Sequence, residues 1–201
     1  MIEKADYEPV CKKMCLQNKW KQLDLHFNKE FNLYVKYFDG VNNMIEIFDL
    51  LKQGKIMSPA NGSLTYVNGE LIIDELQIIV AVEQALRHKN GIIHKMKCST
   101  LAAEIIYCLS MSNKITNCFK QIGLQSSTKS IIAILLIPQN EDIESSIIQT
   151  DSLINCLVDS KSSTNLAVIK QIYQLPDRDF STHEILVQII NKIITKDIFL
   201  K

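Results

Sequence analysis

The chain has 201 residues, of which 47% are hydrophobic, and its 22 basic residues balance its 22 acidic ones. This length and composition suit a single globular domain with a substantial core. A net charge of zero excludes a global field that would draw nucleic acid or membrane to the whole surface. The longest apolar run, Ile131–Ile137, is far shorter than the roughly 20 residues that a membrane span needs.

The first 21 residues carry mixed charge and little periodicity, so we expect a poorly ordered extension or one short helix there. The domain proper is expected to cover residues 22–201. Its first strand is predicted over Phe31–Tyr37, where alternate apolar residues share one face. A helix over Met44–Leu51 should follow, capped by Asn42 or Asn43 and ended by Gly54.

The next stretch contains an Asn68-Gly69 pair, which suits a tight type I′ turn. We therefore predict a small hairpin between residues 64–67 and 70–73. A stronger helix is expected to begin after Asp74 and to end near Gly91. Its inner face carries apolar residues at helical spacing, namely Ile78, Ile79, Val82, Ala85 and Leu86.

Two short amphipathic helices are predicted back to back between Lys95 and Gly123. Ser99 or Thr100 can cap the first, whose apolar residues are Leu101, Ile105, Cys108 and Leu109. Ser112 or Asn113 can cap the second, which places Ile115, Cys118, Phe119 and Ile122 on one face. The segment offers apolar faces and basic side chains suited to contact with other molecules, and it contains no group that resembles a catalyst.

The remaining elements are a strand and three helices. Ile131–Ile137 has no polar alternation, which is typical of a strand covered on both faces. Short helices are predicted around Ser152–Val158 and over Leu166–Tyr173. A last helix begins at a capping box of Ser181 and Glu184. It carries two adjacent apolar stripes, one of Ile185, Ile189 and Ile193 and one of Leu186, Ile190 and Ile194.

Motifs for catalysis or cofactor binding are missing. The six glycines build no phosphate-binding loop, and no nucleophile elbow or zinc-protease motif occurs. Glu104 stands alone on an apolar helix, which favours an internal ion pair or a helix-terminal charge. His88 and His94 are expected on the surface, and Cys11 and Cys15 lack the further ligands of a zinc site. We therefore expect no enzymatic activity, no cofactor and no metal.

Charge is distributed unevenly along the chain. Between Ala85 and Ser130 the sequence has seven basic residues and a single acidic residue, Glu104. Residues 139–160, in contrast, include five acidic residues and no basic one. We predict a basic patch that contacts RNA phosphates, formed by Arg87, Lys89, Lys95, Lys97 and Lys114. The alternative is that these residues are ordinary solvent-exposed charges at the helix ends and bind no RNA.

The run HKMKCSTLAAEIIYCLSMSNKITNCFKQIGLQ, from His94 to Gln125, resembles the small kinase-binding subunits of the KEOPS (EKC) complex, the TPRKB family. Residues 23–25, 168–175 and 194–198 extend the resemblance over residues 22–201. It implies an α/β (α+β-like) single domain with a small, mostly antiparallel sheet surrounded by helices. It also implies a non-catalytic subunit that binds and activates a PRPK-type atypical kinase/ATPase and contacts other KEOPS subunits indirectly.

The resemblance further implies a role in N6-threonylcarbamoyladenosine modification beside the tRNA anticodon, with contact near the tRNA 3′ end. Ser99 stands where relatives often carry an Arg, so one expected RNA contact is missing. The expected compartments are the cytoplasm and the nucleus. We assign kinase binding to the helix Lys114–Ile122 together with the C-terminal helix Ser181–Lys196, through Ile115, Phe119, Ile122, Ile189 and Ile193. The alternative is that Ile115, Phe119 and Ile122 belong only to the core. An independent RNA-binding protein and a small enzyme remain the alternatives.

Overall fold

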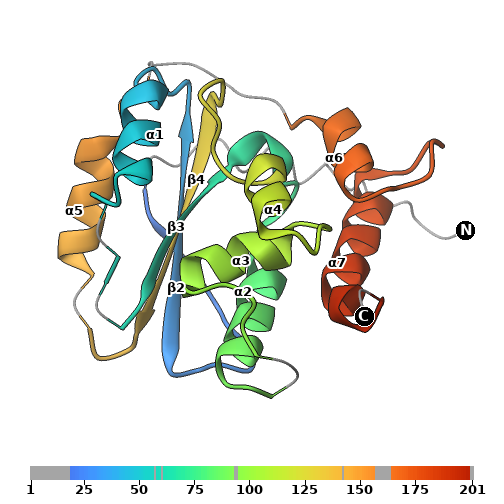
Figure 1. Cartoon of the computed structure of the whole chain (residues 1–201), viewed down its shortest axis with the longest axis horizontal. Coiled ribbons are helices and arrows are strands. Elements are labelled where there is room, and N and C mark those ends of the chain that lie inside the picture. Colours follow the sequence, from blue (N-terminus) through green and yellow to red (C-terminus); the bar gives the residue numbers. More distant parts are fainter. Residues whose placement is uncertain are drawn as a thin grey trace, which may run out of the picture.

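The structure, a computed structural model, describes residues 19–199 except 57, 60, 93, 94, 142 and 157–163, and its side chains as far as residue 196. The described residues form a four-stranded antiparallel sheet in the order β1-β2-β4-β3, with helices on both faces (Figure 1). The strands are β1 Lys21–Leu23, β2 Phe31–Asp39, β3 Ser63–Asn68 and β4 Ser130–Pro138. The predicted α/β class with a small antiparallel sheet is confirmed.

The central strand β4 divides the core into two layers. It pairs with β2 on one side and with β3 on the other, and eight of its nine residues are buried. Ile132, Ile134 and Leu136 belong to one apolar cluster, whereas Ile131, Ala133, Leu135 and Ile137 belong to the other. The absence of polar alternation in this strand therefore has the expected cause, because both faces are covered.

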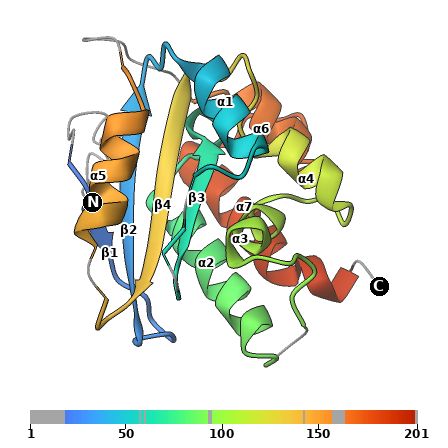
Figure 2. The ribbon, with the colours of Figure 1, turned by 60° about the vertical axis from the view of Figure 1, so that its left-hand side comes forward.

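The two faces of the sheet are covered unequally. One face carries α1 and α5 (Figure 2). The opposite face carries the larger layer of helices and the short 3₁₀ helix η2. The helices are α1 Met44–Lys52, α2 Glu75–Lys89, α3 Leu101–Leu109, α4 Ile115–Gln121, α5 Glu144–Leu153, α6 Leu166–Ile172 and α7 Thr182–Phe199, and η2 is Gly69–Leu71. No helix in the described ranges is long and apolar enough to cross a membrane.

Local sequence signals account for most helix starts. The Asp74 side chain accepts from Leu76 N at 2.8 Å and caps α2. Asn43 precedes α1 as predicted, but its side chain bonds Leu153 O and Asn155 N instead of capping the helix. These bonds tie α1 to the end of α5, so a predicted cap residue acts in tertiary packing.

Two predicted elements are wrong. Residues 64–73 form no hairpin, because β3 pairs with β4 and the Asn68 side chain accepts from Glu70 N, which starts η2. The helix expected around Ser152–Val158 lies earlier: α5 ends at Leu153, and residues 157–163 are outside the described part. The short strand β1 was not predicted, and it begins at the end of the expected extension, whose residues 1–18 are likewise not described.

Candidate interaction site

The helices α3 and α4 form the segment that was singled out from the sequence. Thr100 caps α3 by accepting from Ala103 N at 3.2 Å, as predicted. Ser112 does not cap α4 directly; its hydroxyl accepts from Lys114 N at 3.1 Å in the preceding turn, and Lys114 is the N-cap residue. The turn between the helices is thus defined by local hydrogen bonds of Ser112.

The apolar face of α4 is split between core and surface. Ile115 is 39% exposed and Phe119 is 40% exposed, whereas Ile122 is completely buried. Ile122 belongs to the same apolar cluster as Cys118 of α4 and Ile105 of α3. Of the three residues in and directly after α4 that were assigned to kinase binding, only Ile115 and Phe119 can therefore meet a partner without rearrangement of the chain.

The two stripes of α7 differ in the same way. Ile189 and Ile193, both assigned to kinase binding, are at most 1% exposed and face the core. The second stripe lies nearer the surface, with Leu186 and Ile190 half-buried and Ile194 43% exposed. The predicted width of the apolar face is confirmed, but the assigned residues lie on its buried edge. The kinase contact itself stays a prediction.

The basic residues lie around both ends of α3. Lys95 and Lys97 are exposed in the segment that precedes α3, and Lys114 is exposed in the turn that follows it. The nine residues of α3 span about 13 Å. Arg87 and Lys89, at the end of α2, lie over the rings of Phe27 and Phe31 at 5.9 Å and 5.0 Å. One continuous patch of all five residues stays a prediction.

An apolar groove lies beside this segment and was not predicted. It has a volume of about 340 Å³ and runs between α1, β3, α3 and α4. Its lining includes Phe48, Lys52, Tyr66, Thr100, Ile106 and Phe119. Because these residues come from two separate parts of the chain, one with α1 and β3 and the other with α3 and α4, no local pattern in the sequence could reveal the groove.

Behind the basic segment lies a buried polar cluster. Glu104 is completely buried, and its Oε1 lies 2.7 Å from Nδ1 of His88, which is 2% exposed. The other oxygen, Oε2, accepts from Lys97 N at 2.9 Å and from Cys98 N at 2.8 Å. Glu104 lies in the first turn of α3, as one of the two predicted explanations required, and its internal partner is His88. The expectation that His88 lies on the surface is wrong, because His88 is the buried partner of this carboxylate.

The same cluster contains groups that can bind metals. His88, Glu104 and Cys108 offer ligand atoms within 4.8 Å of one another. Both carboxylate oxygens already accept hydrogen bonds, however, and the His88–Glu104 distance is that of a hydrogen bond. Cys11 and Cys15, the pair considered for zinc, lie outside the described residues.

The thiols of the cluster are poor nucleophiles. Burial, with the nearby Glu104 carboxylate, raises the pKa of the Cys98 thiol to about 12. Burial also raises the pKa of the Cys108 thiol, against the opposing hydrogen bond from His88. Since the thiolate is the reactive form, neither cysteine is prepared for nucleophilic catalysis near neutral pH.

The sequence model of one protein family, described as "Kinase binding protein CGI-121", matches residues 38–197. The chain belongs to this family. The match includes α3, α4 and most of α7, which form the candidate site.

Curated relatives support the same family. The zebrafish (Danio rerio) "EKC/KEOPS complex subunit TPRKB" is 28% identical over 87% of this chain and 97% of the relative. "EKC/KEOPS complex subunit CGI121" of Debaryomyces hansenii is 25% identical over 73% of this chain and 80% of the relative. The protein of the same name from Yarrowia lipolytica is 22% identical over 71% and 79%, respectively.

Proposed function

We propose that the chain is a non-catalytic subunit of an EKC/KEOPS complex that binds the PRPK-type kinase and helps to recruit tRNA. The observation that carries the kinase part is the exposed apolar pair Ile115 and Phe119 on α4, in a chain of a kinase-binding family. The cytoplasm and the nucleus are the compartments proposed for this complex.

The proposed kinase surface consists of the outer face of α4 and the outer stripe of α7. Ile115, Phe119 and Ile194 are each about two-fifths exposed, and Val187 adds a further exposed apolar side chain on α7 at 42%. Burial of such side chains supplies the main favourable term in protein association. Fully desolvated aromatic residues near the centre of an interface contribute most strongly, so Phe119 is the expected anchor.

Phe119→Glu tests the kinase contact. A charge placed in a desolvated interface should lower the affinity for the kinase subunit at least tenfold, about 1.4 kcal/mol or more. The matched control is Ile148→Glu, because Ile148 is 65% exposed on α5, on the opposite face of the sheet. If both variants fold and bind the kinase equally well, the outer face of α4 is not the contact.

The tRNA part of the proposal combines the groove with the basic segment. Single-stranded nucleic acid binds where bases stack on aromatic side chains and cations follow the backbone. The groove offers the ring of Phe48 together with Lys52. Its lining also includes Thr100, which directly follows the segment that carries Lys95 and Lys97. This combination suits a short single strand such as the 3′ end of tRNA.

The variant Lys95→Glu/Lys97→Glu tests the tRNA contact in the kinase-bound chain. If both lysines contact phosphates, affinity should fall and the slope of log affinity against log salt should decrease by about 0.7–0.9 per contact. Lys129→Glu, at an exposed position before β4, is the control. Unchanged affinity and slope in the double variant would show that these lysines are ordinary solvent-exposed charges that make no phosphate contact. Equal tRNA binding without the kinase would favour the independent RNA-binding protein.

A further inference from the structure

The segment between α2 and α3 carries Lys95 and Lys97 but has no helix or strand of its own from residue 95 to residue 100. Its conformation must therefore be fixed by other contacts. Two of its consecutive backbone N–H groups, those of Lys97 and Cys98, donate to the same oxygen, Oε2 of Glu104. One carboxylate thus accepts the backbone hydrogen bonds that a helix or strand would otherwise satisfy in this segment.

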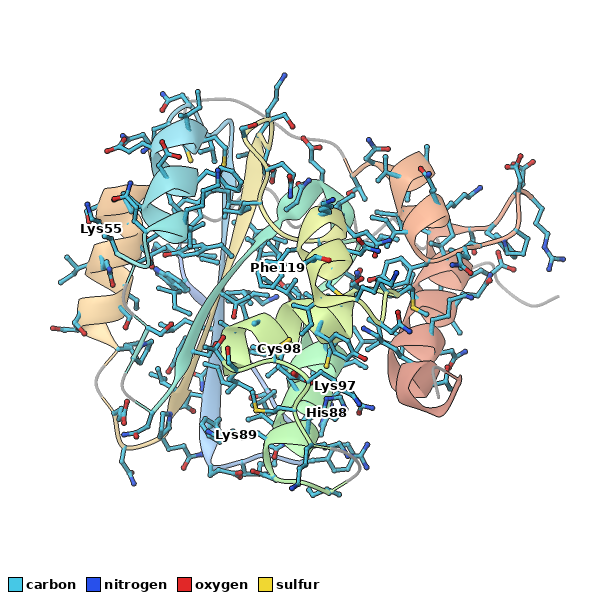
Figure 3. The ribbon with its side chains drawn as sticks, in the orientation of Figure 1. Lys55, His88, Lys89, Lys97, Cys98 and Phe119 are labelled. Atoms are coloured by element: carbon cyan, nitrogen blue, oxygen red, sulfur yellow. The ribbon has the colours of Figure 1, made fainter. Side chains whose placement is uncertain are left out.

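The second oxygen of this carboxylate anchors the segment to another helix. Oε1 of Glu104 lies 2.7 Å from Nδ1 of His88, which belongs to α2. Figure 3 shows His88, Lys97 and Cys98 in the same region of the molecule. Glu104 therefore joins three parts of the chain, namely α2, the basic segment and its own helix α3.

This arrangement decides which side chains of the segment face outward. Cys98 is 8% exposed and packs in the main apolar cluster, while its neighbour Lys97 is exposed. We propose that Glu104 is a positioning residue, which fixes the backbone at Lys97 and Cys98 so that Lys97 and Lys95 are presented to an RNA phosphate backbone. This inference rests on the tRNA contact proposed above.

The chain contains a matched control for this role. Glu83 of α2 is also buried, at 7% exposed, and one of its oxygens accepts from His26 N at 2.6 Å and Phe27 N at 2.9 Å. Glu83 therefore fixes a different irregular segment by the same device. A loss of tRNA binding that came only from general destabilisation should appear equally in both variants.

The experiment measures binding of an in vitro transcribed tRNA with an intact CCA end to the kinase-bound chain. Glu104→Ala should weaken binding at least fivefold, whereas Glu83→Ala should change it less than twofold. Glu104→Gln keeps the size of the side chain and one acceptor oxygen, so it should weaken binding less than Glu104→Ala. If Glu104→Ala does not fold, Glu104→Gln against Glu83→Gln decides the question, with a loss expected in the first variant alone.

Coupling between the residues distinguishes positioning from a structural role. In a Lys95→Ala/Lys97→Ala background, the Glu104 variant should have no further effect on tRNA affinity, because the side chains it positions are gone. Additive losses would overturn the inference, as would equal losses in the Glu104 and Glu83 variants. If the lysine variant weakens binding and the Glu104 variants do not, only this inference fails. If the lysine variant binds tRNA normally, both the proposed tRNA contact and this inference fail.

Discussion

The N–H of Asn68, the last residue of β3, donates a 2.9 Å hydrogen bond to the carbonyl oxygen of Ile122, directly after α4. This bond fixes the end of α4 to the sheet edge and places the Ile122 side chain in the core. The next residue must be small, because a Cβ on Gly123 would lie 2.6 Å from the Phe119 carbonyl oxygen. The two sides of α4 therefore have different roles: Ile122 supports the fold, and Phe119 is available to a partner.

The first prediction concerns stability at these two positions. Ile122→Ala should lower the free energy of unfolding by about 2–5 kcal/mol, because it removes buried methyl groups and leaves a cavity. Phe119→Ala should cost less than about 1 kcal/mol, since its ring is partly solvated in the free chain. Urea denaturation of the isolated chain measures both values. Equal costs at the two positions would contradict this division of α4.

A second prediction separates the two edges of α7. Ile189→Ala should destabilise the chain by about 2–5 kcal/mol, whereas Ile194→Glu should leave its stability within about 1 kcal/mol of the original. Ile194→Glu should instead weaken capture of the kinase, because Ile194 lies on the exposed edge. Thermal unfolding and quantitative co-purification are the two measurements. Normal capture by a folded Ile194→Glu variant would remove α7 from the proposed interface.

Elements with a complete local signal were predictable. The alternation from Phe31 to Tyr37, the unbroken apolar run of β4 and the capping box before α7 each require only neighbouring residues. The predicted hairpin at Asn68-Gly69 failed because the turn preference of this pair competed with pairing of β3 to β4, which lies more than 60 residues away in sequence. Tertiary pairing decided the outcome, as is common for strands.

The candidate site could be predicted only in part. Periodicity identified the apolar faces of α4 and α7, but it could not show which edge of each face meets the core. That choice depends on long-range packing, which buries Ile122 and Ile189 and leaves Phe119 exposed. His88 was likewise misplaced, because its partner Glu104 lies 16 residues away on another helix.

A third prediction concerns the reactivity of Cys98. Raising its pKa from 9.0 to about 12 lowers the thiolate fraction at pH 8 by about a thousandfold. Iodoacetamide should therefore label Cys98 at least about a hundredfold more slowly in the folded chain than in urea. Cys156, which is exposed, should react sooner, although its pKa is also raised by burial of the thiol. Peptide mapping by mass spectrometry distinguishes the sites, and rapid native labelling of Cys98 would contradict its burial.

The last prediction uses the capping box of α7. Glu184 Oε2 accepts from the Ser181 hydroxyl at 2.7 Å and from Ser181 N at 2.8 Å, and these two bonds lower the pKa of the Glu184 carboxyl. A carboxyl whose pKa is lower in the folded state stabilises that state above its unfolded pKa, which is about 4.3. The contribution disappears as the pH falls through the lower folded value.

The stability difference between the original chain and Glu184→Gln should therefore be largest above about pH 5 and should shrink as the pH falls below about 4. Ser181→Ala, which removes the hydroxyl that caps Glu184 N, should cost about 1 kcal/mol near neutral pH. It should also reduce the pH dependence, because the main cause of the pKa shift is gone. Thermal unfolding at a series of pH values measures all three chains. A Glu184→Gln difference that stays constant from pH 7 to pH 3 would show that the carboxylate charge plays no part in starting α7.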